Sequence, residues 1–190
     1  MSSISTLLRQ LIRESVSRPK IYVLVGPPGV GKSYWVEQNI SDPYIISRDV
    51  VVDMVRQPLG LKYDDMFGPM GREASKEVDR IHRENVAGAV KSGKNIVVDM
   101  TNMGIGSRKN ALKAISGHAD NYEKIAVFFD YRGMEDLVHK SIKRRGRELN
   151  DKHLSPEIVN GMINRFEMPT REEGFDDIIV VDPSEALNRP

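Results

Sequence analysis

The sequence lacks cysteine altogether, in a chain of 190 residues. Disulfide bonds, thiol nucleophiles and thiolate metal sites are therefore excluded, and the composition is typical of a reducing, intracellular compartment such as the cytoplasm. Long apolar runs are lacking too, because no stretch approaches the roughly 20 residues of a membrane-spanning helix. Residues 1–15 carry no positive segment ahead of their leucines, so we expect neither a secretory signal nor a membrane partner.

An excess of charge of one sign is also missing. The 28 Lys and Arg residues face 27 Asp and Glu residues, for a formal net charge of +1. This balance excludes a strongly basic coat protein for nucleic acid, but it leaves room for a local basic patch. Hydrophobic residues make up 39% of the chain and charged residues 29%, which is typical of one globular domain and argues against extensive disorder.

Short apolar runs alternate with segments of helical periodicity along the chain. Strands are predicted at residues 21–25, 44–46, 95–99, 124–130 and 177–181. Helices are predicted at 32–40, 49–57, 72–91, 107–117, 134–145 and 155–166. Alternation of this kind builds βαβ units, so the expected fold class is α/β, a parallel sheet flanked by helices on both faces.

Two further segments complete the expected organisation. An amphipathic helix is predicted over residues 3–17, within an N-terminal unit 1–19 that precedes the main domain at 20–190. Residues 57–71 are rich in glycine and proline, which predicts an exposed loop. The pattern sets no oligomeric state.

The strand at 21–25 runs directly into a glycine-rich motif, and a predicted helix follows. The stretch GPPGVGKS fits the pattern G-x-x-x-x-G-K-[ST]. In this setting the glycines let backbone N–H groups face a phosphate, the lysine reaches the β- and γ-phosphates, and the final hydroxyl is a ligand for Mg²⁺. We therefore expect a nucleoside triphosphate and Mg²⁺. The motif consists of Gly26, Pro27, Pro28, Gly29, Val30, Gly31, Lys32 and Ser33.

The phosphate loop alone does not reveal what is done with the nucleotide. A GTPase would carry a base-specifying N-K-x-D tetrapeptide, which the sequence lacks, and a larger motor ATPase would need more chain. The size and the motif together favour a small kinase that moves the γ-phosphoryl group to an acceptor.

Phosphoryl transfer to a hydroxyl needs a carboxylate beside the phosphate loop, within reach of the acceptor proton. Asp49 follows the second predicted strand and Asp99 ends the third, both at the edge where an open parallel sheet forms its ligand crevice. Each has a simpler alternative role, since Asp49 could cap a helix and Asp99 could form a strand-end turn. On the functional interpretation, Asp99 holds Mg²⁺ together with Ser33.

Four motifs in this order resemble those of the polynucleotide 5′-kinase family, in particular the kinase domain of polynucleotide kinase/phosphatase enzymes. They are GPPGVGKS, SRD at 47–49, DMTN at 99–102 followed by Ser107 and Arg108, and FEMPTREEGF at 166–175. The likeness runs from about residue 21 to residue 181. It implies ATP and Mg²⁺ as cofactors, an adenylate-kinase-like core, and DNA or RNA as the phosphoryl acceptor.

The same resemblance implies roles for individual residues. Asp49 would be the general base, and Lys32 would act on the transferred phosphate. A lid arginine would contact the γ-phosphate, and Arg145 best matches that position, within a locally basic segment at 139–153. The alternative for this segment is a solvated helix end whose cations complement the helix dipole. Contacts to the acceptor are implied for Arg48, Arg56, Asp99, Thr101, Asn102 and Arg108.

One position departs from that family. Many members carry an arginine three residues after the base, where it holds the phosphate next to the acceptor hydroxyl. This chain has Val52 there, and the nearest arginine, Arg56, lies one helical turn further on. Either Arg56 takes over the contact or the acceptor is presented differently.

Three acceptors are therefore considered. The first, which the shared motifs favour, is the 5′-hydroxyl of DNA or RNA. The second is the hydroxymethyl group of 5-hydroxymethyluracil within DNA, which bacteriophage kinases of the same superfamily phosphorylate in the host cytoplasm; Val52 fits this internal acceptor better. The third is a small metabolite or nucleotide, as for a toxin-like kinase. Aromatic residues in the segment 57–71 could offer a platform to a base or could simply close a small pocket.

Overall fold

The computed structural model describes residues 18–62, 64–67, 71–116, 121–148 and 154–189. The helix expected at 3–17 lies outside the described residues. Within the described ranges, none of the helices combines the length and the apolarity needed to cross a bilayer.

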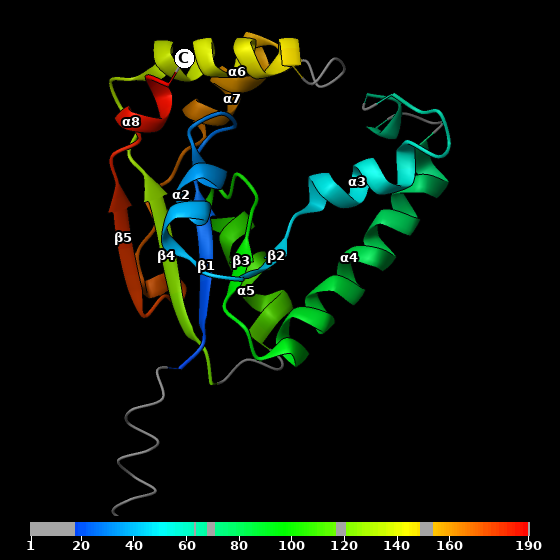
Figure 1. The fold of residues 1–190 in the computed structure, drawn as a ribbon, viewed down its shortest axis with the longest axis vertical. Helices are drawn as coiled ribbons and strands as arrows, with labels where there is room; N and C mark the ends of the chain where they lie inside the picture. The colour runs from blue at the N-terminus through cyan, green and yellow to red at the C-terminus, as the bar shows by residue number, and fades with distance from the viewer. Residues whose placement is uncertain (1–17, 63, 68–70, 117–120, 149–153, 190) are drawn as a thin grey trace, which may run out of the picture.

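Five parallel strands form a single sheet, as the alternating pattern predicts (Figure 1). In spatial order they are β2 (Tyr44–Ile46), β3 (Ile96–Val98), β1 (Lys20–Val25), β4 (Glu123–Phe129) and β5 (Asp177–Val181). Every neighbouring pair is parallel. The central strands are buried because helices cover them on both sides, which is why their sequences are continuous apolar runs.

Both faces of the sheet carry helices, and alternate residues of β1 serve the two sides. Ile21 and Val23 belong to a cluster with residues of α4 (Arg72–Ser92) and α5 (Ile105–Ser116). Leu24 belongs to a second cluster on the opposite face. That cluster includes Val36 of α2 (Lys32–Asn39), Val138 of α6 (Glu135–Glu148) and Leu187 of α8 (Ser184–Leu187).

Among the described residues, the remaining helices are α3 (Arg48–Arg56), α7 (Pro156–Asn164) and two short 3₁₀ turns, η1 (Asp64–Phe67) and η3 (Arg171–Glu173). Most predicted helices appear within a few residues of their expected bounds. The short α8 was not predicted, because one turn leaves no periodic pattern to detect.

Helices α3 and α4 form an arm that extends to one side of the sheet (Figure 1). The arm has its own apolar cluster, which includes Val51, Val52, Met66 and Val78. The prediction of an exposed loop at 57–71 was wrong for part of that segment, since η1 puts Met66 into this cluster with only 4% of its side chain exposed. Gly71 permits the close approach, because a Cβ there would lie 2.4 Å from the Met66 Cα.

Candidate active site

A cleft lies at the carboxyl ends of the parallel strands. The phosphate-loop motif follows β1, Asp49 follows β2 and Asp99 follows β3, so parallel pairing brings all three to one edge of the sheet. The cleft has a volume of about 350 Å³. Its lining residues are Pro28, Gly29, Lys32, Ser33, Ser47, Asp49, Val50, Asp53, Asp99, Met100, Thr101, Ile142 and Leu154.

The phosphate loop curls because two of its glycines adopt left-handed backbone angles. Gly29 has φ +77° and Gly31 has φ +97°, values that residues with a Cβ rarely adopt. The Lys32 ammonium donates to the carbonyls of Gly26 at 3.0 Å and Pro27 at 2.9 Å, so it lies across the loop. The first turn of α2 follows at once, and its N–H groups and dipole favour an anion at this point.

Two neighbouring helices contact the apex of the loop, which we define as Gly29 to Gly31. The Ser141 hydroxyl of α6 donates to the Gly29 carbonyl at 2.8 Å. A Cβ on Gly31 would lie 2.4 Å from the Cβ of Ala186 in α8. The apex is therefore fixed by α6 and α8, independently of the strands that supply the rest of the cleft.

Replacing Gly31 by alanine is expected to weaken MgATP binding at least about tenfold, because the new methyl group both strains a left-handed residue and collides with Ala186. Gly60→Ala is the matched control, since Gly60 has φ +67° and nothing within 4 Å of its added Cβ. Titrations with MgATP would compare the two variants. Equal affinities would show that the contact with α8 does not shape the loop.

Asp49 faces the cleft from the first turn of α3. Ser47, not Asp49, occupies the N-cap position of this helix, and the Ser47 side chain makes no capping hydrogen bond. A carboxylate two residues into a helix is favoured by the helix dipole, and Asp49 is exposed to the cleft. Its position suits a group that accepts a proton from a hydroxyl bound beside the phosphate loop.

Asp99 is fixed where β3 meets the cleft. Its backbone N–H donates to the Ile46 carbonyl at 2.9 Å, which ties the ends of β2 and β3 together. The Asp99 and Ser33 side chains line the same cleft as Lys32. One carboxylate and one hydroxyl beside a phosphate site are the donors that Mg²⁺ uses when it is bound partly through phosphates, so these residues fit that ion.

Two arginines expected at the acceptor are engaged elsewhere. Arg48 pairs with Asp79 of α4 at 2.7 Å. Burial, with Arg48 as a neighbour, lowers the pKa of His82, so this imidazole is neutral at pH 7 and does not oppose the pair. Arg56 is buried, donates to Asp53 at 2.7 Å and reaches the Leu61 carbonyl at 3.4 Å. Neither arginine lines the cleft.

Asn102 and Arg108 also differ from the expectation that they contact the acceptor. Asn102 is buried, and its amide donates to the Leu24 carbonyl at 2.9 Å. The Arg108 side chain is fully buried and forms an ion pair with Glu173. Burial among protein partners removes both side chains from the cleft, whereas their neighbour Thr101 does line it.

The segment expected to form a basic lid, 139–153, begins as regular helix in α6. Arg145 lies in the last turns of this helix, and its side chain and residues 149–153 lie outside the described part of the chain. Ile142 and Leu154 line the cleft on either side of this gap. No role was predicted for these two apolar residues, because only the tertiary fold brings them beside the phosphate loop.

A second hollow of about 340 Å³ opens on the other side of the loop. It is lined by Gly31, by Tyr34 and Trp35 of α2, and by the chain that follows β5. The Tyr34 hydroxyl donates to Glu185 at 2.7 Å, and this hydrogen bond raises the pKa of Tyr34. Trp35 is the single tryptophan of the sequence, so its fluorescence can report on events at the loop.

The sequence and the fold both resemble those of known proteins. Residues 21–169 match the family model AAA_33, described as an AAA domain. A candidate kinase from Chloroflexus aurantiacus superposes with a TM-score of 0.61 at 13% identity, covering 93% of this chain and 91% of that one. A structure from the PezAT toxin-antitoxin system of Streptococcus pneumoniae gives 0.60 at 17% identity, covering 96% and 78%. At these identities the likeness shows the fold alone. No curated protein sequence matches at a significant level.

Proposed function

We propose that this chain, which belongs to the AAA domain family AAA_33, a P-loop family whose model spans residues 21–169, is an ATP-dependent kinase acting on a hydroxyl group of nucleic acid. The observation that carries the proposal is the cleft itself. Lys32 and Ser33 of the phosphate loop share it with the carboxylates Asp49 and Asp99. These are the groups that phosphoryl transfer to an alcohol needs in one place.

The proposed reaction is a direct transfer. The oxygen of the acceptor hydroxyl attacks the γ-phosphorus of ATP, and Asp49 accepts the proton of that hydroxyl. The bond between the γ-phosphorus and the β–γ bridging oxygen breaks, and ADP leaves. Lys32 and the N–H groups of the loop stabilise charge on the phosphate oxygens. Ser33 and Asp99 would hold Mg²⁺, which neutralises the β- and γ-phosphates when it is bound.

The residues of α3 that follow Asp49 bear on the nature of the acceptor. In the polynucleotide 5′-kinase family that the motifs resemble, many members carry an arginine three residues after the general base, where it holds the phosphate next to the acceptor hydroxyl. Val52 is 5% exposed inside the arm cluster, and Arg56 is equally buried against Asp53, so this stretch offers no such cation to the cleft. This observation supports a hydroxymethyl group on a base within DNA over the terminal 5′-hydroxyl, which we keep as the second candidate on the strength of the shared motifs.

The experiment follows γ-labelled ATP with Mg²⁺ and two oligonucleotides. One carries a free 5′-hydroxyl, and the other is blocked at its 5′ end and contains internal 5-hydroxymethyluracil. We expect label on the second. Label on the first alone would establish the 5′-kinase and reject the internal acceptor. If neither is labelled while ATP still binds, the acceptor is not nucleic acid of these kinds, and a small hydroxylated metabolite becomes the next substrate to assay.

A further inference from the structure

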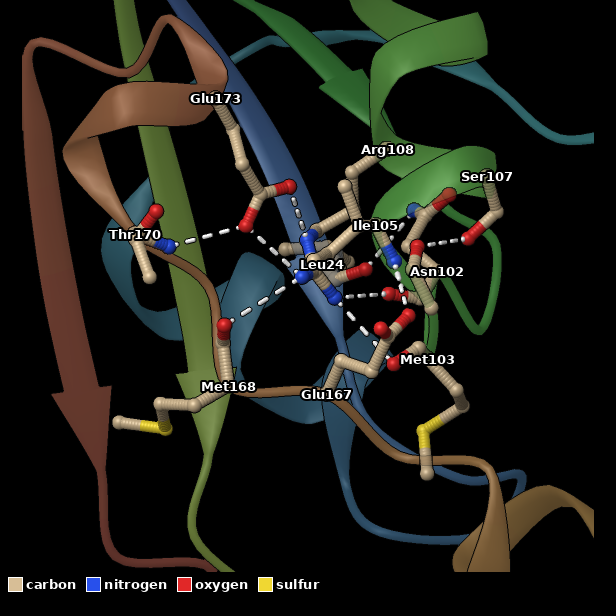
Figure 2. Close-up of polar contacts among 11 residues, drawn as sticks. Leu24, Asn102, Met103, Ile105, Ser107, Arg108, Glu167, Met168, Thr170 and Glu173 are labelled. Atoms are coloured by element: carbon tan, nitrogen blue, oxygen red, sulfur yellow. Dashed lines mark hydrogen bonds and ion pairs between the residues drawn. The ribbon is translucent and has the colours of Figure 1, made fainter.

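A buried ion pair joins two motifs that lie far apart in the sequence (Figure 2). Arg108 of α5 and Glu173 of η3 are 65 residues apart, and the guanidinium Nε and Nη2 each donate to one carboxylate oxygen at 2.8 Å. The Arg108 side chain is 0% exposed and the Glu173 side chain 3%. Two parallel hydrogen bonds of this kind fix the relative orientation of the two side chains and also pair their opposite charges.

The remaining donors of Arg108 bind backbone carbonyls rather than water. Its Nη1 donates to the carbonyls of Asn102 at 3.0 Å and Met103 at 3.2 Å, and its Nη2 reaches that of Met168 at 3.4 Å. Glu173 in turn accepts from the Thr170 N–H at 2.9 Å. The pair therefore clamps the turn that follows Asp99 onto the chain that precedes β5 (Figure 2).

That turn is itself bonded to the phosphate loop. Asn102 has φ +46°, a left-handed conformation that is costly for a residue with a side chain and persists only where its surroundings enforce it. Its amide donates to the Leu24 carbonyl at 2.9 Å. The Gly26 N–H donates to the Thr101 carbonyl at 3.0 Å. A continuous set of hydrogen bonds thus runs from Glu173 through Arg108 to the first glycine of the loop.

Glu167 makes a second connection beside the first. Its N–H donates to the Met103 carbonyl at 2.9 Å, and its carboxylate accepts from the Ile105 N–H at 2.8 Å, at the start of α5. Glu167 follows α7 closely in the chain. The motif at 166–175 is therefore bonded to the turn at 101–103 at several points, and the buried ion pair is the central one.

We propose that Arg108 and Glu173 are positioning residues of the transfer site. They keep residues 99–101, which line the cleft, at a fixed position relative to the phosphate loop. This inference rests on the proposed kinase function. Neither residue touches the cleft, so both act through the turn that Arg108 clamps. The apex of the loop is held separately by Ser141 and Ala186, so the clamp governs the chemical step while ATP affinity depends on the apex.

Arg108→Lys keeps a cation opposite Glu173 but removes the forked donors that bind the carbonyls of Asn102 and Met168. Single-turnover transfer is expected to fall about 10- to 100-fold, the usual effect of displacing a supporting group by a fraction of an ångström. The dissociation constant for ATP measured without Mg²⁺, followed by Trp35 fluorescence, is expected to stay within about threefold of wild type, because the apex is untouched and the cation that Asp99 would hold is left out.

Two control variants separate positioning from general loss of structure. Arg171→Gln removes an exposed arginine of the same motif, which pairs with Asp177 at the surface, and is expected to leave both readouts unchanged. Ile115→Ala opens a cavity at the far end of α5, where Ile115 is 1% exposed, and should lower the melting temperature without slowing transfer below the melting range.

If Arg108→Lys does not fold, the double variant Arg108→Met with Glu173→Met replaces the pair by apolar side chains that a core tolerates. It is expected to fold and still to transfer slowly.

Backbone hydrogen exchange gives a readout that needs no acceptor. In Arg108→Lys, or in the double variant, exchange is expected to quicken at Gly26 and at residues 101–104, with residues 29–33 unchanged. Wild-type transfer rates in either variant, equal losses of transfer and ATP affinity, or unchanged exchange at those positions would each overturn the proposal. If wild type labels no acceptor, the kinase function fails, and the exchange pattern alone then supports or rejects the clamp.

Discussion

Lys32→Ala is expected to reduce phosphoryl transfer at least about 10³-fold while the protein stays folded. The Lys32 ammonium lies across the phosphate loop and donates to the carbonyls of Gly26 and Pro27. Removing it takes away the cation that would meet charge developing on the β- and γ-phosphates. It removes nothing from either apolar cluster of the sheet, so the melting temperature should change little.

The measurement is single-turnover transfer from labelled ATP at saturating acceptor, with thermal unfolding measured in parallel. Lys94→Ala is a suitable control, because Lys94 is an exposed lysine paired with Asp42 before β3 and remote from the cleft lining. It should behave as wild type in both assays. Normal turnover by Lys32→Ala would show that Lys32 does not stabilise the transferred phosphate, whatever the acceptor.

Asp49→Asn is expected to slow the chemical step by about 10²- to 10⁴-fold and to leave MgATP binding intact. The amide keeps the shape of the side chain but cannot take the proton of the acceptor hydroxyl. Rapid-quench transfer in a single turnover is the measurement, because it separates the chemical step from ATP binding and product release.

The same substitution at two nearby carboxylates, Asp53 and Asp99, is expected to have different effects from Asp49→Asn. Asp53→Asn weakens the pairing of a buried guanidinium, that of Arg56, so it should cost about 1–3 kcal/mol of stability and affect transfer mainly through folding. Asp99→Asn should raise the Mg²⁺ concentration needed for activity, because Asp99 shares the cleft with Ser33. A rate for Asp49→Asn within a few-fold of wild type would assign the base to one of these two residues instead.

The strands and the phosphate loop were predictable because their signals are local. Runs such as IYVLV at 21–25 identify buried strands without any tertiary information, and the eight residues of the loop carry their own geometry. Parallel pairing then follows from the alternation of elements. It correctly brings Asp49 and Asp99 to one edge of the sheet with Lys32.

The side-chain environment of Arg108 was not predictable in the same way. Its position in a motif with Thr101 and Asn102 suggested a shared role in binding, yet its partner Glu173 lies 65 residues away. Only the fold shows which members of a motif face the cleft and which support it. Arg56 shows the same limit. Val52 and Arg56 are one helical turn apart and share the buried face of α3, whereas Asp49 and Asp53 share the face toward the cleft.

The arm of α3 and α4 also has a consequence for how such enzymes diversify. Asp49, Val50 and Asp53 all come from one uninterrupted stretch of chain that carries its own apolar cluster, whereas the phosphate loop and its supports come from β1, α2, α6 and α8. On the proposed function, the general base and the phosphate loop therefore lie on separate parts of the sequence. A change within α3 to α4 is then expected to alter the acceptor side of the cleft and to leave the supports of the phosphate loop in place.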